Sequence, residues 1–316
     1  MSQKTALISV YDKTNIVDFC KELSRLCWKI IATGNTAKLL RDNSIAVDLI
    51  EHYTGFAEIL DGRVKTLHPK IYAGILAKRD SEQHINTLNQ NAIATIDLVV
   101  CNVYPFQQTV QKKDVAENEI IEMIDIGGPS MIRASAKNFS SVSVIVSPHD
   151  YHDLIQRLQN NSNDLAFRKF LAAKAFAYVA QYDRAIEKYF ESDDTHIESA
   201  QLPATITLSL SKIADLRYGE NPHQKAALYA SDQNDPFLIS HKCQIQGKEL
   251  SYNNLLDSDT GVRAIAAFSD PACSIIKHLS PCGVATAQTP EQAFREAFSC
   301  DEESHTGSWK MHQKRG

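Results

Sequence analysis

Residues 61–70, with the sequence DGRVKTLHPK, concentrate cations and hydrogen-bond donors in one short stretch. Proline has no amide hydrogen and disfavours helix at the residue before it, so this stretch is expected to form a loop. Arg63, Lys65 and Thr66 could then hold an anionic or polar ligand, although such a charged run could equally be a solvated surface. The histidine and the final lysine of the stretch receive no catalytic part in this interpretation.

Two further stretches carry the hydroxyl groups that suit a phosphate. Residues 9–14 (SVYDKT) and 33–36 (TGNT) each follow an apolar run and precede a helical pattern. Free amide hydrogens at the start of a helix attract a phosphate, and Lys13 would add a full positive charge. A threonine in either stretch could also simply cap its helix. Because two such loops follow consecutive strands, the phosphate is favoured.

A tyrosine, an aspartate and two lysines could move protons at the same edge. Tyr104 follows the most apolar run of the chain, Asp125 precedes a pair of glycines, and Lys137 ends the next helical pattern. With Lys65, they form the set that proton transfer at a carbonyl requires, because a lysine near other cations can have a lowered pKa. Each also has a local interpretation: the tyrosine could pack, the aspartate could cap a helix, and the lysine could face solvent.

Apolar runs of strand length alternate with helical patterns from residue 5 to residue 146. This alternation predicts an α/β fold, with a parallel sheet and helices on both sides. The carboxyl ends of the strands share one edge, so the loops described above would meet there. Strands are expected at residues 5–10, 28–32, 46–50, 98–103 and 142–146, and helices at 16–27, 36–42, 119–124 and 130–136. A long pattern at 166–190 predicts a core helix or a dimer face.

The composition excludes several classes of protein. A length of 316 residues suggests about two domains, and a hydrophobic content of 43% is ample for a core. A net charge of −5 gives no general electrostatic case for binding nucleic acid or an anionic membrane. Seven cysteines without a CxxC pair, and histidines without ligand spacing, predict no metal site and a reduced, cytoplasmic protein. No apolar segment approaches the length that spans a bilayer.

Six motifs occur in one order between residue 5 and residue 190: SVYDKT, TGNTAKLL, YTGFAEILDGRVKTLHPK, VYPF, IDIGGPSMIRASAKN and AFAYVAQYD. Together they resemble the bifunctional purine-biosynthesis family that joins IMP cyclohydrolase to AICAR formyltransferase. Three later motifs, LRYGENPHQ, QGKELSYNN and KHLSPCG, resemble the opening of the formyltransferase domain. The resemblance implies a methylglyoxal-synthase-like α/β domain over residues 1–191, a linker at 192–204, and an incomplete cytidine-deaminase-like α/β transformylase domain at 205–301.

The resemblance also implies a reaction: the first domain closes the ring of FAICAR, the 5-formamido ribonucleotide, to give IMP and water, without a cofactor. The 5′-phosphate would be held by Ser9, Lys13, Thr33, Gly34 and Thr36. The base and its carboxamide would contact Arg63, Lys65, Thr66 and Asn102. The backbone could approach the ligand closely at Gly127 and Gly128. The catalytic residues implied are Lys65, Tyr104, Asp125 and Lys137.

Two positions depart from the family pattern. Tyr11 stands where serine is usual, and Asn35 stands where glycine is usual. If a positive φ is required at position 35, asparagine is the least costly replacement for glycine. Phosphate binding is therefore expected to be weakened at most.

The second domain is expected to lack its activity. Arg217, Tyr218, Lys277 and His278 match family positions that serve formyl transfer from 10-formyltetrahydrofolate to AICAR. The polar residues 302–316 do not match the family's continuation, which predicts a non-family tail produced by a frameshift or a premature stop. Transformylase activity is expected to be lost, and the homodimer found in the family is left open here.

Two other functions remain open beside the cyclohydrolase. The chain could be a decayed, non-catalytic protein that binds purine nucleotides, or a methylglyoxal-synthase-type lyase that acts on dihydroxyacetone phosphate. The loop from Arg63 to Pro69 and the IDIGG segment argue against the lyase. Conversion of FAICAR to IMP distinguishes the enzyme from the binding protein.

Overall fold

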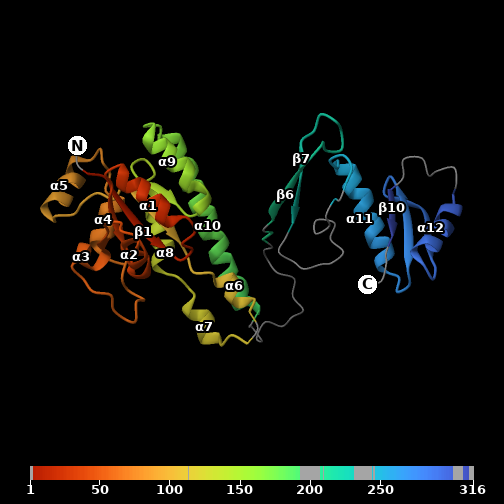
Figure 1. The fold of residues 1–316 in the computed structure, drawn as a ribbon, viewed down its shortest axis with the longest axis horizontal. Helices are drawn as coiled ribbons and strands as arrows, with labels where there is room; N and C mark the ends of the chain where they lie inside the picture. Colours follow the sequence, from red (N-terminus) through yellow and green to blue (C-terminus); the bar gives the residue numbers. More distant parts are fainter. Residues whose placement is uncertain are drawn as a thin grey trace. The chain divides into compact units, whose positions relative to one another are not determined.

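The computed structural model divides the chain into two compact units, Met1–Ala200 and Gln201–Gly316 (Figure 1). The structure describes residues 3–112, 114–192, 207–208, 210–230, 244, 246–301 and 309–312. The linker predicted at 192–204 lies outside the described residues, except for Ser192, which ends a helix.

Unit 1 contains a five-stranded parallel sheet with the strand order β3-β2-β1-β4-β5. Its strands are β1 (Thr5–Val10), β2 (Lys29–Ala32), β3 (Asp48–Leu49), β4 (Leu98–Asn102) and β5 (Ser143–Ile145). Every residue of β4 and β5 is buried, as expected for apolar strands of a parallel sheet that is covered on both faces. The predicted α/β class is therefore confirmed.

Two groups of helices pack around this sheet. Helix α1 (Ile16–Arg25) packs against α2 (Gly34–Asp42) and α9 (Tyr151–Gln159). Helix α8 (Gly127–Lys137) packs against α4 (Pro69–Leu76) and α10 (Leu165–Ser192), which is the long green helix of Figure 1. The remaining elements are α3 (Ile50–Thr54), α5 (Glu82–Gln90), α6 (Phe106–Val110), α7 (Glu117–Glu122) and the 3-10 helix η1 (Pro148–Asp150).

The long helix α10 has a buried face and an exposed face. Leu171, Ala175 and Val179 are at most 1% exposed, and the helix contacts α8, β5 and α6. Phe170 and Phe176 are 55% and 42% exposed on the same helix. One face of α10 is therefore part of the core, as predicted for the long pattern at 166–190, and the other face is exposed.

Three local details differ from the sequence-based expectations. Helix α4 begins at Pro69, inside the predicted loop, because the Nδ1 atom of His68 accepts a hydrogen bond from the amide of Lys70 and caps it. Strand β3 has two residues, fewer than the five expected. Asn35 has no positive φ. Its neighbour Gly34 has a φ of 30°, so the unusual backbone conformation is adopted by the glycine and not by the asparagine.

The described part of unit 2 contains two separate small sheets. One pairs β6 (Ser211–Leu216) with β7 (Ala226–Ala230) in antiparallel fashion. The other has the order β10-β8-β9, from β8 (Ala272–Lys277), β9 (Ser280–Thr286) and β10 (Trp309–His312). Helices α11 (Tyr252–Ala266) and α12 (Pro290–Ser299) pack on the three-stranded sheet. Strand β10 lies inside the segment where a non-family tail is predicted.

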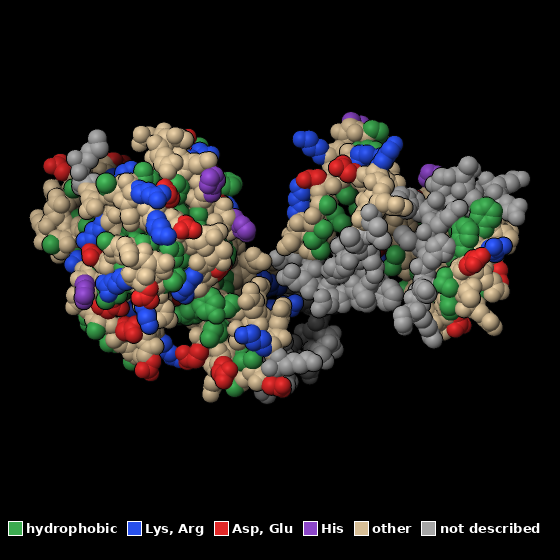
Figure 2. Space-filling model, in the orientation of Figure 1, with side chains coloured by type: hydrophobic (Ala, Val, Ile, Leu, Met, Phe, Trp, Pro, Cys, Tyr) green, Lys and Arg blue, Asp and Glu red, His purple; other side chains and the backbone are tan. Residues whose placement is uncertain are grey.

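The distribution of charged side chains on the surface agrees with the small net charge of the sequence. Figure 2 shows basic and acidic side chains interspersed over the face of unit 1 in view. Within the part of the chain that the structure describes, no helix is long and apolar enough to cross a membrane.

Candidate active site

A pocket opens at the carboxyl edge of the sheet in unit 1, around the ends of β1, β2 and β4. The chain passes from β1 to β2 on one side, and later returns to β4 on the other side of β1. Ligands of open α/β sheets bind at such a reversal. The pocket has a volume of about 550 Å³, which is within the usual range for a small-molecule site. The predicted residues that line it are Ser9, Lys13, Thr33, Thr36, Arg63, Lys65, Thr66, Asn102, Tyr104, Asp125, Gly127 and Gly128.

The two predicted phosphate loops lie next to each other. The Oγ atom of Ser9 is 3.0 Å from Oγ1 of Thr33, and the hydroxyl of Thr36 donates to the carbonyl of Val10 at 3.1 Å. The threonine at position 36 therefore joins the two loops and does not cap its own helix. Gly34 is exposed and lies beside the pocket. It is not among the described residues that line the pocket.

Asn102, at the end of β4, fixes the shape of the first phosphate loop. Its Oδ1 atom accepts hydrogen bonds from the amides of Tyr11 and Asp12, at 2.7 and 2.9 Å. Its Nδ2 atom donates to the carbonyl of Asp12 at 3.1 Å. Both ends of the Asn102 amide are thus used within the protein, so the geometry favours a positioning role over contact with the base.

The basic loop that carries Arg63, Lys65 and Thr66 lies along the pocket wall. Thr66 is buried, Lys65 is half-buried, and Arg63 is exposed and forms an ion pair with Glu122 at the end of α7. A Cβ atom on Gly127 would lie 2.5 Å from Oγ1 of Thr66. The glycine is therefore needed for close packing against the loop.

Asp125 is one of the acids that line the pocket. Its Oδ1 atom accepts a hydrogen bond from the amide of Gly128 at 2.8 Å, and a Cβ atom on Gly128 would collide with Oδ2. Burial raises the pKa of the Asp125 carboxyl above its usual range, while this hydrogen bond and the charge of Lys65 act against the rise. A carboxylate with a raised pKa is a stronger base, which suits proton abstraction.

Tyr104 stands opposite a residue that the sequence reasoning did not assign to the site. The rings of Tyr104 and Tyr11 meet edge to face, with centroids 5.6 Å apart. Tyr11 is 49% exposed, lines the pocket, and accepts at its carbonyl a hydrogen bond from Nζ of Lys13 at 3.2 Å. Glu122 and Asn35 also line the pocket and were missed. For Tyr11 and Asn35, the departure from the family pattern was a signal in the sequence that could have identified them as site residues. Glu122 had no such signal.

Lys137 does not join the other predicted catalytic residues. It is exposed and ends helix α8, which begins at Gly127, so roughly 15 Å of helix separates the two ends. Among the described residues, it is not one of those that line the pocket. The other three predicted catalytic residues, Lys65, Tyr104 and Asp125, all line it.

The predicted transformylase residues of unit 2 lie on two different sheets. Arg217 and Tyr218 follow β6, and Nη2 of Arg217 donates to the hydroxyl of Tyr218 at 3.2 Å. Lys277 ends β8, and His278 and Leu279 form the turn to β9 with φ values of 51° and 62°. Across the described ranges, no group of three or more acidic, histidine or cysteine side chains is arranged to hold a metal ion.

The fold of unit 1 is that of an MGS-like domain, since the family model with that description matches residues 15–130. A second family model, described as the AICARFT/IMPCHase bienzyme, matches residues 135–312, more than half of the chain. The chain therefore belongs to the AICARFT/IMPCHase bienzyme family, which confirms the predicted resemblance. This match ends at residue 312 and so includes β10, where a non-family tail was expected.

Among solved structures, the chain is similar to a crystal structure of ForH. The two share 35% sequence identity, and the likeness covers 60% of this chain and 100% of the ForH chain, with a TM-score of 0.54. The likeness thus concerns a part of this chain about as long as unit 1.

Proposed function

We propose that unit 1 is an IMP cyclohydrolase, which closes FAICAR to IMP with loss of water. The observation that carries this proposal is one pocket, which gathers a basic loop, a half-buried acid, a tyrosine and two hydroxyl-rich loops at one sheet edge. Membership of the AICARFT/IMPCHase bienzyme family supports the choice of reaction.

The reaction needs positioning and proton transfer only. The carboxamide nitrogen bonds to the formyl carbon and loses one proton. The formyl oxygen takes up two protons, which balance that proton and the proton lost by the formamide nitrogen. The C–O bond then breaks, water leaves, and the formamide nitrogen forms a double bond to the carbon. Nucleophile and electrophile belong to one molecule, so holding them in the reactive geometry supplies much of the rate. Asp125, with its raised pKa, accepts the proton from nitrogen. Lys65 and the Tyr104 hydroxyl stabilise the negative charge that develops on the formyl oxygen.

The phosphate end of the substrate is assigned to the paired loops of β1 and β2. Ser9, Thr33 and Lys13 line the pocket there, beside the N-terminus of α2. Hydroxyl groups, helix-terminal amides and one ammonium suit a phosphate dianion. This assignment leaves the basic loop and Asp125 for the base and its two substituents.

The decisive test is the conversion of FAICAR to IMP by the purified protein, followed by ultraviolet absorbance. We expect turnover without an added metal or cofactor, and we expect the Asp125→Asn variant to be inactive. A wild-type protein that is folded by circular dichroism but gives no IMP would refute the proposal.

A second candidate is a protein that binds purine nucleotides without turnover. Two observations favour it: Arg63 is paired with Glu122, and Lys137 lies away from the pocket. Calorimetric binding of IMP together with an absence of turnover would support this candidate over the enzyme.

For unit 2 we propose no formyl transfer, although the family's second reaction uses 10-formyltetrahydrofolate. The candidate residues are spread over two sheets, and the buried apolar cluster of the described part is small. An assay with AICAR and 10-formyltetrahydrofolate that gave FAICAR would overturn this. A cytoplasmic location is part of the same proposal.

A further inference from the structure

Helix α10 carries three polar side chains on one face, and the proposed chemistry uses none of them. Lys174, Tyr178 and Tyr182 are spaced by four residues, so they lie above one another on the helix. Each reaches a segment that follows a strand or leads into the pocket. The question is whether they only pack or also hold these segments in place.

Tyr182 holds the segment that carries Asp125. Its hydroxyl accepts a hydrogen bond from the amide of Asp125 at 2.7 Å and donates one to the carbonyl of Met123 at 2.8 Å. The hydroxyl oxygen of Tyr182 therefore bonds to the backbone on both sides of Ile124. Burial raises the pKa of Tyr182 to about 12, so the hydroxyl keeps the proton that it donates.

Tyr178 holds the segment that carries Tyr104. Its hydroxyl accepts a hydrogen bond from the amide of Val103 at 3.1 Å, directly before Tyr104. The ring of Tyr182 also meets Phe106 edge to face, with centroids 6.3 Å apart, on the other side of Tyr104. The same helix face thus contacts the loop between β4 and α6 at Val103 and the first residue of α6 at Phe106.

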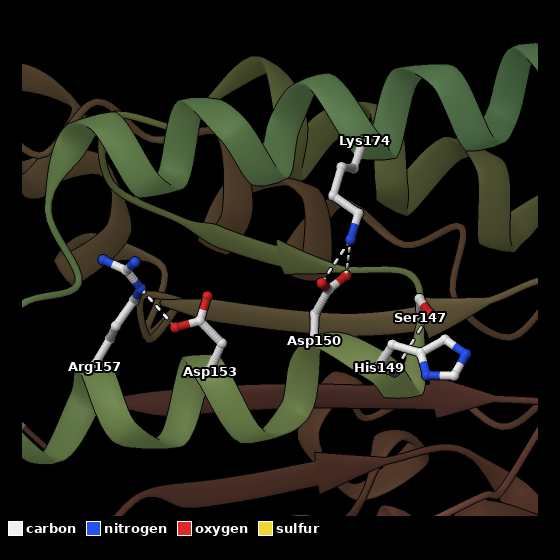
Figure 3. Close-up of polar contacts among 6 residues, drawn as sticks. All are labelled: Ser147, His149, Asp150, Asp153, Arg157 and Lys174. Atoms are coloured by element: carbon white, nitrogen blue, oxygen red, sulfur yellow. Dashed lines mark hydrogen bonds and ion pairs between the residues drawn. The ribbon is translucent and has the colours of Figure 1, made fainter. Parts of the chain in front are cut away.

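Lys174 anchors this face to the end of the sheet. Its Nζ atom bonds to both carboxylate oxygens of Asp150, at 2.5 and 2.6 Å, and the Asp150 side chain is 15% exposed. Figure 3 shows Lys174 pointing from α10 toward Asp150, which precedes α9. The neighbouring Arg157 pairs with Asp153 along α9, and its guanidinium also lies over the ring of Phe167 on α10, with 4.0 Å from Cζ to the ring centroid.

We propose that Lys174, Tyr178 and Tyr182 form a positioning element, the α10 clamp, which sets the separation of Tyr104 and Asp125 in the pocket. This inference rests on the proposed cyclohydrolase function. Tyr104 and Asp125 come from two different loops, and a rigid helix that bonds to both loop backbones fixes one relative to the other. Rings that served packing alone would not need hydroxyls directed at these backbone groups, since phenylalanine would fill the same space.

The test compares three Tyr→Phe variants. Tyr182→Phe removes two hydrogen bonds, so we expect kcat to fall about 10- to 100-fold while KM changes less than about twofold. Tyr178→Phe removes one, so we expect a fall in kcat of about 3- to 10-fold. Tyr53→Phe is the matched control, because its hydroxyl donates to the carbonyl of Ala94, outside the pocket, at 3.2 Å. We expect its kcat to equal that of the wild type.

A second readout is independent of activity. Amide hydrogen exchange at Asp125 should accelerate at least about tenfold in Tyr182→Phe, and exchange at Val103 should do so in Tyr178→Phe. Unchanged exchange at both amides overturns the clamp. Accelerated exchange with an unchanged kcat also overturns it, because the segments would then be held without consequence for the reaction. If the wild type makes no IMP, the proposed function fails, and exchange alone decides whether α10 holds the two segments.

Discussion

The two units of this chain bury their apolar residues in different ways. Unit 1 has one continuous cluster that joins all its layers, from β1 to α10. In the described part of unit 2, the corresponding cluster of buried residues consists of Cys273, Ile275, Ala293 and Ala297. Stability rises with the apolar surface removed from water, so the two units are expected to differ greatly in stability. The described part of unit 2 therefore gives a site less packed support than unit 1 does.

The comparison teaches that matching residues do not by themselves make a site. Both units contain the residue types that their family motifs require. In unit 1 most of them line one pocket, because five parallel strands end at one edge, whereas Gly34 and Lys137 lie outside its lining. In unit 2 they lie on two sheets that share no strand among the described residues.

The largest expected effect is that of Asp125→Asn on cyclisation. Loss of the proton acceptor should lower kcat about 10²- to 10⁴-fold, measured as IMP formation by absorbance. Asp257→Asn is the control in unit 2, because Asp257 likewise accepts a backbone hydrogen bond, from Leu279 at 2.8 Å. A loss of cyclisation in the Asp257 variant would break the functional separation of the two units.

The same Asp125 variant should be more stable than the wild type at neutral pH. The folded-state pKa of Asp125 is raised, so its charged form is disfavoured by folding, and the wild type loses stability as pH rises through that pKa. Asparagine has no such titration and keeps an oxygen for the amide of Gly128. Urea midpoints between pH 4 and pH 8 should diverge with rising pH; equal midpoints throughout would contradict the raised pKa.

The next effect is that of Lys65→Met. Removal of this charge should lower kcat/KM about 10²- to 10³-fold. Lys70→Met is the control from the same stretch, because Nζ of Lys70 lies 5.1 Å over the ring of Tyr53 and away from the pocket lining. Equal losses in both variants would show that the stretch contributes only general positive charge.

A pair of core substitutions tests the difference in stability directly. Ile8→Ala and Ile275→Ala each remove a fully buried side chain, and each should cost about 2–5 kcal/mol in its own unit. Ile8→Ala should lower the temperature at which cyclisation is lost, whereas Ile275→Ala should leave it unchanged. Calorimetry should show two transitions in the wild type, and a single shared transition would contradict independent units.

The smallest expected effect is that of Glu122→Gln. It frees Arg63 for the ligand, and because both side chains are exposed the KM for FAICAR should fall only about two- to threefold. Glu291→Gln, which breaks the exposed pair with Arg295 in unit 2, is the matched control and should not change KM. A rise in KM would mean that Glu122 holds Arg63 in its working position.

The sequence was sufficient for the elements with strong local signals. Uninterrupted apolar runs predicted the bounds of β1, and those of β4 to within one residue. Because the two strands end at the same edge, the sequence also predicted that Ser9 and Asn102 lie close together. Helix α4 was missed because its start depends on a histidine cap, which has no strong sequence signature. The distance of Lys137 from the pocket was available from the helix rise, since α8 starts at the glycine pair.

Contacts between distant segments could not be predicted, because nothing local encodes them. The hydrogen bonds from Asn102 to the loop after β1 and the ion pair from Arg63 to Glu122 depend on the tertiary arrangement. The same holds for the tyrosines of α10. The long pattern at 166–190 predicted a core helix or a dimer face, but it did not indicate that the hydroxyls of Tyr178 and Tyr182 reach the backbone of two other loops.

The bonds from Asn102 to Tyr11 and Asp12 have a consequence for how the protein folds. They join residues about 90 positions apart in sequence, so the first phosphate loop cannot take its final shape until β4 has paired with β1. Such long-range pairing forms slowly. The ligand-binding state is therefore expected to appear late in folding, together with the complete sheet. A nucleotide that binds only this state would protect the whole of unit 1 against unfolding, by an amount that grows with its concentration.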